Sequence, residues 1–138
     1  MPGDEAVNGE GNMSDRMFFL RLALIAVGLI FILAVYPLMI LWPSGWAWGH
    51  GHSHYAMMIV GVYATLGVFL LLASRDPLNH RSLIWFTVWS SVVHGAIMAI
   101  QSFQDPMESG HLIGDVPALF IAAILLAVLM PRSKMANA

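Results

Sequence analysis

The sequence predicts an all-α integral membrane protein, built as a bundle of four transmembrane helices. Of its 138 residues, 59% are hydrophobic and only 10% are charged, and the mean hydropathy is +0.75. A soluble domain carries about 25% charged residues to solvate its surface, so most of this surface must face something other than water. The apolar residues also form long runs without the alternation of barrel strands, which indicates helices.

Four apolar runs satisfy the requirement of about 20 residues for a membrane-crossing helix. They cover approximately residues 17–42, 55–73, 83–104 and 111–130. The predicted helical domain is 16–132, followed by a short C-terminal tail at 133–138. A polar, acidic segment at 1–15 precedes it and is expected to be a disordered tail. The first run exceeds the core of about 7–15 residues in a secretory signal peptide, so we expect it to be retained.

Prolines affect the boundaries of two predicted helices. Pro37 should kink the first helix, because proline has no N–H to donate. The fourth helix either begins at Asp115, with Pro117 in its first turn, or begins near Ser109 and kinks at Pro117. The first choice leaves only about 15 residues, which is short for a membrane span. The sequence leaves both choices open.

Basic residues orient the predicted bundle. All six lie before the first helix, between the second and third, or after the fourth: Arg16, Arg21, Arg75, Arg81, Arg132 and Lys134. Because basic residues concentrate in cytoplasmic segments, both termini are predicted to be cytoplasmic and the topology to be up-down-up-down. The first and third loops then face the opposite side, which is the periplasm for a bacterial inner (cytoplasmic) membrane.

Aromatic and small residues suggest how the helices sit. An aromatic belt at the membrane interface explains the cluster around the first loop, which comprises Trp42, Trp46, Trp48 and Tyr55. On the second helix, Gly61 and Thr65 form a small-xxx-small pair, which predicts close approach of another helix.

The absence of cysteine excludes disulfides, thiolate zinc sites, iron–sulfur clusters and cysteine nucleophiles. A net charge of −2 without a basic cluster gives no sign of nucleic-acid binding. The expected partners are the lipid bilayer, together with either further copies of the chain or the subunits of a larger membrane complex.

Histidines are concentrated on the predicted periplasmic side. Imidazole binds zinc, copper, iron and nickel, and nearby thioethers favour copper. A histidine and carboxylate site for copper or zinc is therefore predicted there. Its candidate metal ligands are His50, His52, His54, His111 and His94. Its supporting or proton-relay residues are Glu108, Asp115, Met58, Met98 and Gln101.

Two histidines have neighbours that suggest a role. His94 lies about 15 Å along the third helix from its outer end, where an ionisable group is costly and indicates function. Interhelical hydrogen bonding explains it equally well. His111 and Asp115 lie four residues apart and can share a helix face. A carboxylate placed like that of Asp115 fixes the tautomer of a metal-bound histidine. The pair of residues would serve a proton relay equally well.

The first functional hypothesis is a periplasm-facing transition-metal site with a redox or metal-handling role. A b-type haem held by His54 and His111 is an alternative, as is a quinone-binding or proton-linked protein using His94, His111 and Asp115. A third alternative is a non-catalytic small subunit of a larger membrane complex. No reaction is assigned, and whether the protein is an enzyme stays open.

Overall fold

The computed structural model describes residues 2–48 and 53–132, with side chains from residue 11 onward. Its elements are α1 (Pro2–Leu29), the π-helix η1 (Ile30–Ala34), α2 (Val35–Leu41), α3 (Pro43–Trp46), α4 (His54–Ala73), α5 (Arg81–Gln104), the 3-10 helix η2 (Pro106–Leu112) and α6 (Asp115–Leu129). Within these described residues, four helical stretches are long and apolar enough to cross a membrane: 11–41, 54–73, 81–104 and 106–129. This indicates a helical membrane protein.

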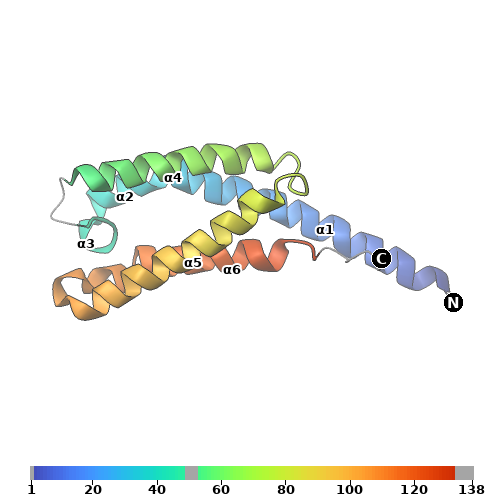
Figure 1. Ribbon diagram of the computed structural model, residues 1–138. Coiled ribbons are helices and arrows are strands. Elements are labelled where there is room, and N and C mark those ends of the chain that lie inside the picture. The colour runs from blue at the N-terminus through green and yellow to red at the C-terminus, as the bar shows by residue number, and fades with distance from the viewer. Residues whose placement is uncertain (1, 49–52, 133–138) are drawn as a thin grey trace.

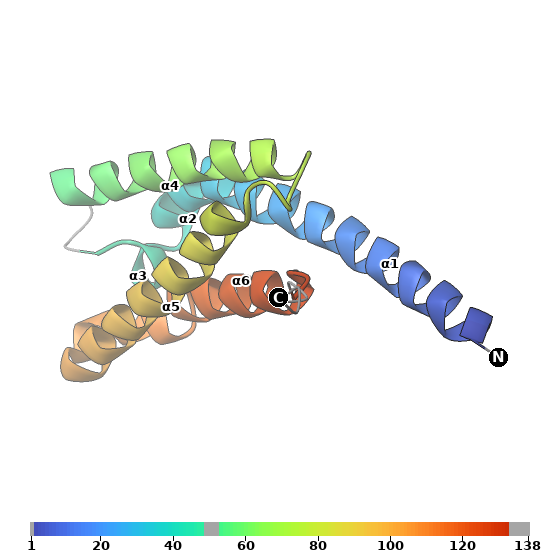
Figure 2. The same cartoon turned by 45° about the vertical axis from the view of Figure 1, so that its right-hand side comes forward.

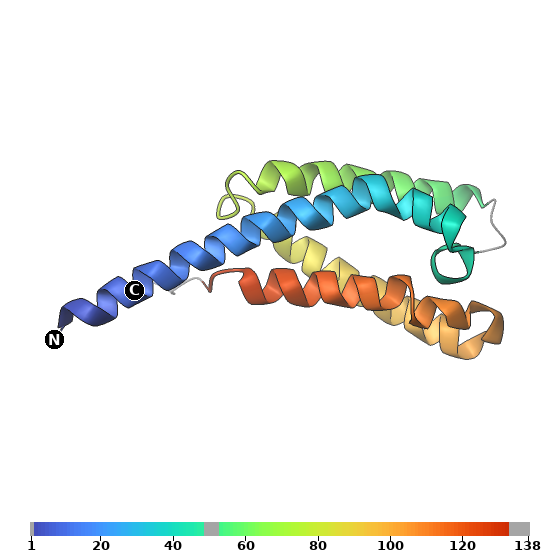
Figure 3. The ribbon, with the colours of Figure 1, turned by 180° about the vertical axis from the view of Figure 1, so that it is seen from behind.

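The helices form two hairpins. α4 returns along α1 and η1, and α6 returns along α5 (Figures 1 and 3). The hairpins lie close together where residues 74–80 connect them, and they separate toward the other end, where α3 lies between them (Figure 2). We call the first end the arginine end, after Arg16 and Arg81, and the second the histidine end, after His54 and His111.

The first helix differs from its expected boundaries. α1 begins at Pro2, and its N-terminal part projects beyond the bundle (Figure 1), whereas a disordered tail was expected over 1–15. Residues 11–15 are all exposed. Extending a helix that already exists costs much less than nucleating one, so the apolar helix can continue into this polar segment.

A kink was expected at Pro37, and the structure has the π-helical turn η1 one turn earlier. In this turn the backbone N–H of Val35 donates to the carbonyl of Ile30, five residues back. Pro37 cannot donate to a carbonyl of the preceding turn, and its ring crowds that turn, so the chain widens there. η1 also places Phe31 edge-on against Tyr63, with ring centroids 4.8 Å apart.

A glycine pair sets the contact between α1 and α4. A Cβ atom added at Gly67 would lie 2.6 Å from the carbonyl oxygen of Gly28, so only glycine allows this approach. Gly61 and Thr65, which were expected to make a helix contact, are both exposed in the single chain. The close contact thus lies on α4, but at a different position from the expected one.

The apolar core is centred on the arginine end. Its most deeply buried side chains are Leu20, Leu24, Leu70, Ile84, Leu126 and Met130. Two arginines close this end by binding carbonyls at the end of α6. Arg16 donates to the carbonyls of Val128 at 2.7 Å and Met130 at 3.4 Å, and Arg81 donates to that of Pro131 at 2.8 Å. These carbonyls lack intrahelical donors, which the arginines supply.

The fourth apolar run is divided into two elements. α6 begins at Asp115, which answers the question of its start, and the preceding residues 106–112 form η2 instead of a longer α-helix. Pro117 lies in the first turn of α6, where its missing N–H has no intrahelical partner to lose. The 15-residue α6 is therefore short for a membrane span, and η2 supplies most of the remaining residues of the apolar stretch 106–129.

Candidate functional site

Backbone contact between α3 and η2 builds the histidine end. A Cβ atom at Gly110 would lie 2.2 Å from the carbonyl oxygen of Ser44, and one at Gly114 would lie 2.2 Å from that of Gly45. Glycine at both positions lets the two segments touch directly. This contact fixes the chain that leaves α3 and brings Trp48 beside His111.

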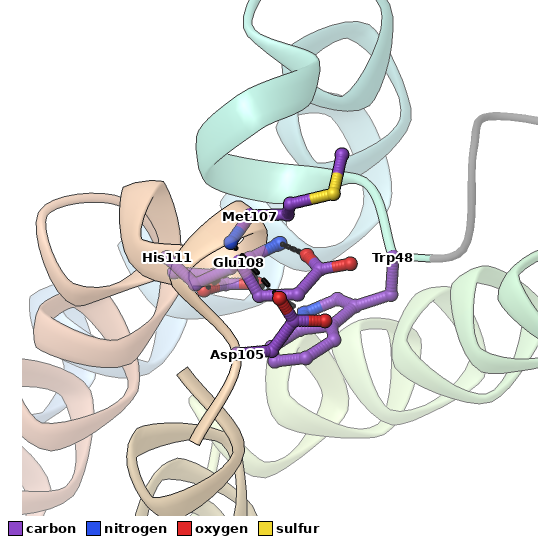
Figure 4. Close-up of polar contacts among 6 residues, drawn as sticks. Trp48, Asp105, Met107, Glu108 and His111 are labelled. Carbon is purple, nitrogen blue, oxygen red and sulfur yellow. Dashed lines mark hydrogen bonds and ion pairs between the residues drawn. The ribbon is translucent and has the colours of Figure 1, made fainter. Parts of the chain in front are cut away.

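His111 lies at the centre of a buried polar cluster (Figure 4). Its side chain is 0% exposed, and its Nδ1–H donates to the Asp115 carboxylate, 2.9 Å from Oδ1 and 3.0 Å from Oδ2. Its other ring nitrogen, Nε2, lies 3.1 Å from Oε2 of Glu108. The exposed fraction of the side chain is 24% for Glu108 and 10% for Asp115. The three groups thus run from a partly exposed carboxylate to a nearly buried one.

Trp48 holds the cluster from the opposite side. Its ring stacks on the His111 imidazole, with centroids 4.0 Å apart and an interplanar angle of 24°. Its indole Nε1–H donates to Oδ2 of Asp115 at 3.2 Å. Sequence reasoning assigned Trp48 to an aromatic belt and missed this role. Nothing in the sequence around Trp48 shows that it reaches a residue 67 positions away.

A cavity of about 630 Å³ lies between the two hairpins next to this cluster. Its walls are mainly aliphatic and aromatic side chains from the first helix, α4, α5 and α6, and the polar groups among them include Tyr63, His94, Gln101 and Asp115. Several lining residues on the membrane-spanning helices are exposed: Tyr55, Ile59, Ile97 and Ile121. The cavity therefore opens toward surfaces that lipid would cover.

A second, smaller cavity of about 340 Å³ shares Trp48 and Gln101 with the first. Its lining residues are Trp48, Gln101, Gln104, Asp105 and Glu108. Asp105 is exposed and caps η2 by accepting a hydrogen bond from the backbone N–H of Met107 at 2.9 Å (Figure 4). Trp48 and Gln101 line both cavities, so the polar cavity and the apolar one adjoin at these two residues.

Tyr63 and His94 form a polar pair deeper in the bundle. The Tyr63 hydroxyl lies 2.5 Å from Nδ1 of His94, and this hydrogen bond joins α4 to α5. His94 was expected to have an interior partner or a ligand, but Tyr63 was missed. A signal for it existed, because a hydroxyl near the middle of an apolar helix needs a hydrogen-bond partner.

The predicted site residues fall into separate groups. His50 and His52 lie outside the described residues. His54 is the exposed first residue of α4, Met58 on the same helix is exposed, and Met98 is buried beside Leu119. The structure brings His111 together with Glu108 and Asp115, while His94 pairs with Tyr63. Within residues 2–48 and 53–132, no three histidine, aspartate or glutamate side chains converge in the manner of a metal site.

Comparison with known proteins gives a family but no function. A family model described as a family of unknown function (DUF6632) matches residues 15–138, so the chain belongs to that family. No curated protein matches the chain. No solved structure matches it either.

Proposed function

We propose that this member of a family without a known function binds an amphipathic, lipid-soluble molecule in the cavity between its hairpins. We further propose that binding is linked to uptake or release of a proton by Glu108, His111 and Asp115. One observation carries the proposal: the Asp115 carboxylate is both the inner end of the buried polar cluster and part of the cavity wall.

The shape and chemistry of the cavity support a ligand that arrives from the lipid phase. Its volume of about 630 Å³ falls within the range of about 300–1,000 Å³ that is typical of small-molecule sites. Such sites combine mostly apolar walls with a few polar groups, as this one does. The exposed lining residues Ile97 and Ile121 mark openings that face lipid rather than water.

The buried cluster supports the proton link. Ionisable groups within an apolar helical stretch are costly and are retained for a use such as proton transfer. Here an imidazole lies between two carboxylates, within 3.1 Å of Glu108 and 2.9 Å of Asp115. Imidazole can take a proton on one nitrogen while releasing one from the other, so this order of groups suits transfer between the surface and the cavity.

Orientation in the membrane is part of the proposal. Arg16, Arg75 and Arg81 lie at the end of the bundle opposite His111, and basic residues concentrate on the cytoplasmic side. The histidine end would then face the periplasm of a bacterial inner membrane. Protons would accordingly be exchanged with that compartment.

A transition-metal site remains a second proposal. Nε2 of His111 is buried and makes no hydrogen bond within the described part of the chain, although Oε2 of Glu108 lies 3.1 Å away. Such an arrangement would suit two ligands of copper or zinc, with further ligands from His50 and His52. Metal analysis of the purified protein tests this: stoichiometric copper or zinc that is lost in Glu108→Gln supports it, and a metal-free protein overturns it.

Calorimetric titration tests the main proposal. The protein in lipid nanodiscs is titrated with decyl-trimethylphenol, an amphipathic single-ring probe, and the heat from empty nanodiscs is subtracted. The titration is repeated in two buffers that differ in ionisation enthalpy, so that any difference in heat reports proton exchange. We expect saturable binding with a buffer-dependent heat, and loss of the buffer dependence in Asp115→Asn.

Two variants on α6 locate the binding site. Ala118 lines the cavity, so the ring of Ala118→Phe should occupy part of it and weaken probe binding at least about ten-fold. Ile124 is exposed and lies outside the cavity lining, so Ile124→Phe on the same helix should bind as the wild type does. Equal probe binding by both variants would contradict the assignment of the binding site to the cavity. Identical heats of binding in the two buffers would contradict the link between binding and proton exchange.

A further inference from the structure

We infer that the preferred occupant of the cavity is a para-quinone or the corresponding quinol. This inference rests on the proposed function and names the class of its ligand. The observation behind this inference is that two separate hydrogen-bonding groups reach one apolar cavity. Asp115 on α6 is the first, and the Tyr63–His94 pair between α4 and α5 is the second.

The Tyr63–His94 pair can act as a donor. When the Tyr63 hydroxyl donates to Nδ1 of His94, the neutral imidazole carries its proton on Nε2. That N–H is then available to a carbonyl oxygen in the cavity that His94 lines. The pair also spans both hairpins, so a ligand bound to it contacts both halves of the bundle.

Asp115 can match either oxidation state of such a ligand. Its Oδ2 accepts hydrogen bonds from both His111 and Trp48, whereas its Oδ1 accepts from the His111 side chain alone, so Oδ1 keeps a further acceptor position. It can therefore accept from a quinol hydroxyl. When a proton reaches it through His111, it can instead donate to a quinone carbonyl.

The chemistry of the two groups favours a ligand with two polar ends. A para-quinone has one oxygen on each side of a flat apolar ring, so it offers a hydrogen-bond partner to each of the two groups that line the cavity. A fatty acid or a simple phenol has one polar end and leaves the other group without a ligand partner. Flat rings also pack well on aromatic side chains, and the walls include Phe31, Trp46 and Trp48.

The openings of the cavity accommodate the remainder of such a ligand. Membrane quinones carry a long apolar tail, which must leave the site without entering water. Tyr55 and Ile59 on α4 and Ile121 on α6 line the cavity and are exposed, so the cavity is open beside them. A tail that leaves past these residues would remain in lipid.

Calorimetry with matched ligands tests this inference. Decyl-trimethyl-para-benzoquinone is compared with decyl-trimethylphenol, which has the same tail but only one oxygen. For the wild type we expect the quinone to bind about ten-fold more tightly. Tyr63→Phe should remove that advantage while changing phenol affinity by no more than about two-fold. Tyr36→Phe is the matched control, because Tyr36 is exposed and lies outside the cavity lining, and it should leave both affinities unchanged.

The outcomes separate the two proposals. A quinone that binds no more tightly than the phenol, or a Tyr63→Phe variant that weakens both ligands equally, overturns the ligand class and leaves the proposed function standing. Failure of both ligands to bind the wild type overturns the proposed function as well. Phenol binding by Tyr63→Phe also shows that the variant is folded, so the loss of quinone preference cannot be an effect of unfolding.

Discussion

The two ends of the bundle are held together in different ways. At the arginine end, fully buried leucines from α1, α4 and α6 pack tightly, and arginines bind carbonyls at the end of α6 and just beyond it. At the histidine end the hairpins separate, and contact is made through glycine backbones and a buried polar cluster. The same helices thus provide a close-packed core at one end and a cavity at the other. Stability and ligand binding are therefore expected to respond to different substitutions.

The largest expected contrast lies between two neighbouring leucines of α6. Leu126 is 0% exposed in the core, whereas Leu125 lines the cavity and is 40% exposed. Leu126→Ala should lower the free energy of unfolding by about 2–5 kcal/mol, because it leaves a void in packed surroundings. Leu125→Ala should lower it by less than about 1 kcal/mol. Denaturant titration in detergent, followed by tryptophan fluorescence, measures both, and equal losses would contradict the contrast between core and cavity.

A smaller loss is expected at the glycine contact of the histidine end. Gly114→Ala places a Cβ atom against the Gly45 backbone, which cannot move aside as a flexible side chain would. We expect a loss of about 1–3 kcal/mol. Gly61→Ala is the control, since nothing lies within 4 Å of its added Cβ atom, and it should be neutral or slightly stabilising. Thermal unfolding measures both variants, and a Gly114→Ala midpoint equal to that of Gly61→Ala would argue against a fixed contact between α3 and the start of α6.

The smallest effect is expected from the arginines. Arg16→Gln removes the hydrogen bonds to Val128 and Met130 and should cost about 0.5–1.5 kcal/mol. Arg21→Gln removes the same charge from an exposed position of the same helix, so it isolates the hydrogen bonds from the effect of charge. Unfolding in detergent compares the two variants. If Arg21→Gln lowers the free energy of unfolding as much as Arg16→Gln does, the hydrogen bonds from Arg16 to the end of α6 do not contribute to stability.

Much of the helical framework could be predicted from hydropathy. The expected span at 55–73 corresponds to α4 at His54–Ala73, and that at 83–104 corresponds to α5 at Arg81–Gln104. Hydropathy could not show which helix faces pair, because lipid and a protein interior are equally apolar. The exposed pair at Gly61 and Thr65 and the contact at Gly67 illustrate this.

The candidate site was predictable only where its residues are close in the sequence. The spacing of His111 and Asp115 already suggested a contact, and Glu108 precedes His111 by three residues. Trp48 and Tyr63 act through residues on other helices, at sequence separations of 67 and 31. Their roles depend on how the hairpins are placed against each other. The cavity has the same origin, because it is formed by helices that diverge and no single segment encodes it.

The π turn η1 has a consequence for the phase of the first helix. A turn with hydrogen bonds to the fifth residue back contains one residue more than an α-helical turn, and one residue corresponds to about 100° of rotation. The residues before η1, such as Leu20, are therefore rotated relative to those after it, such as Val35. One continuous helix can in this way direct one side to the closed core and a different side to the cavity. Deletion of a single residue within 30–34 would restore a regular helix and bring its two halves out of register with their separate partners.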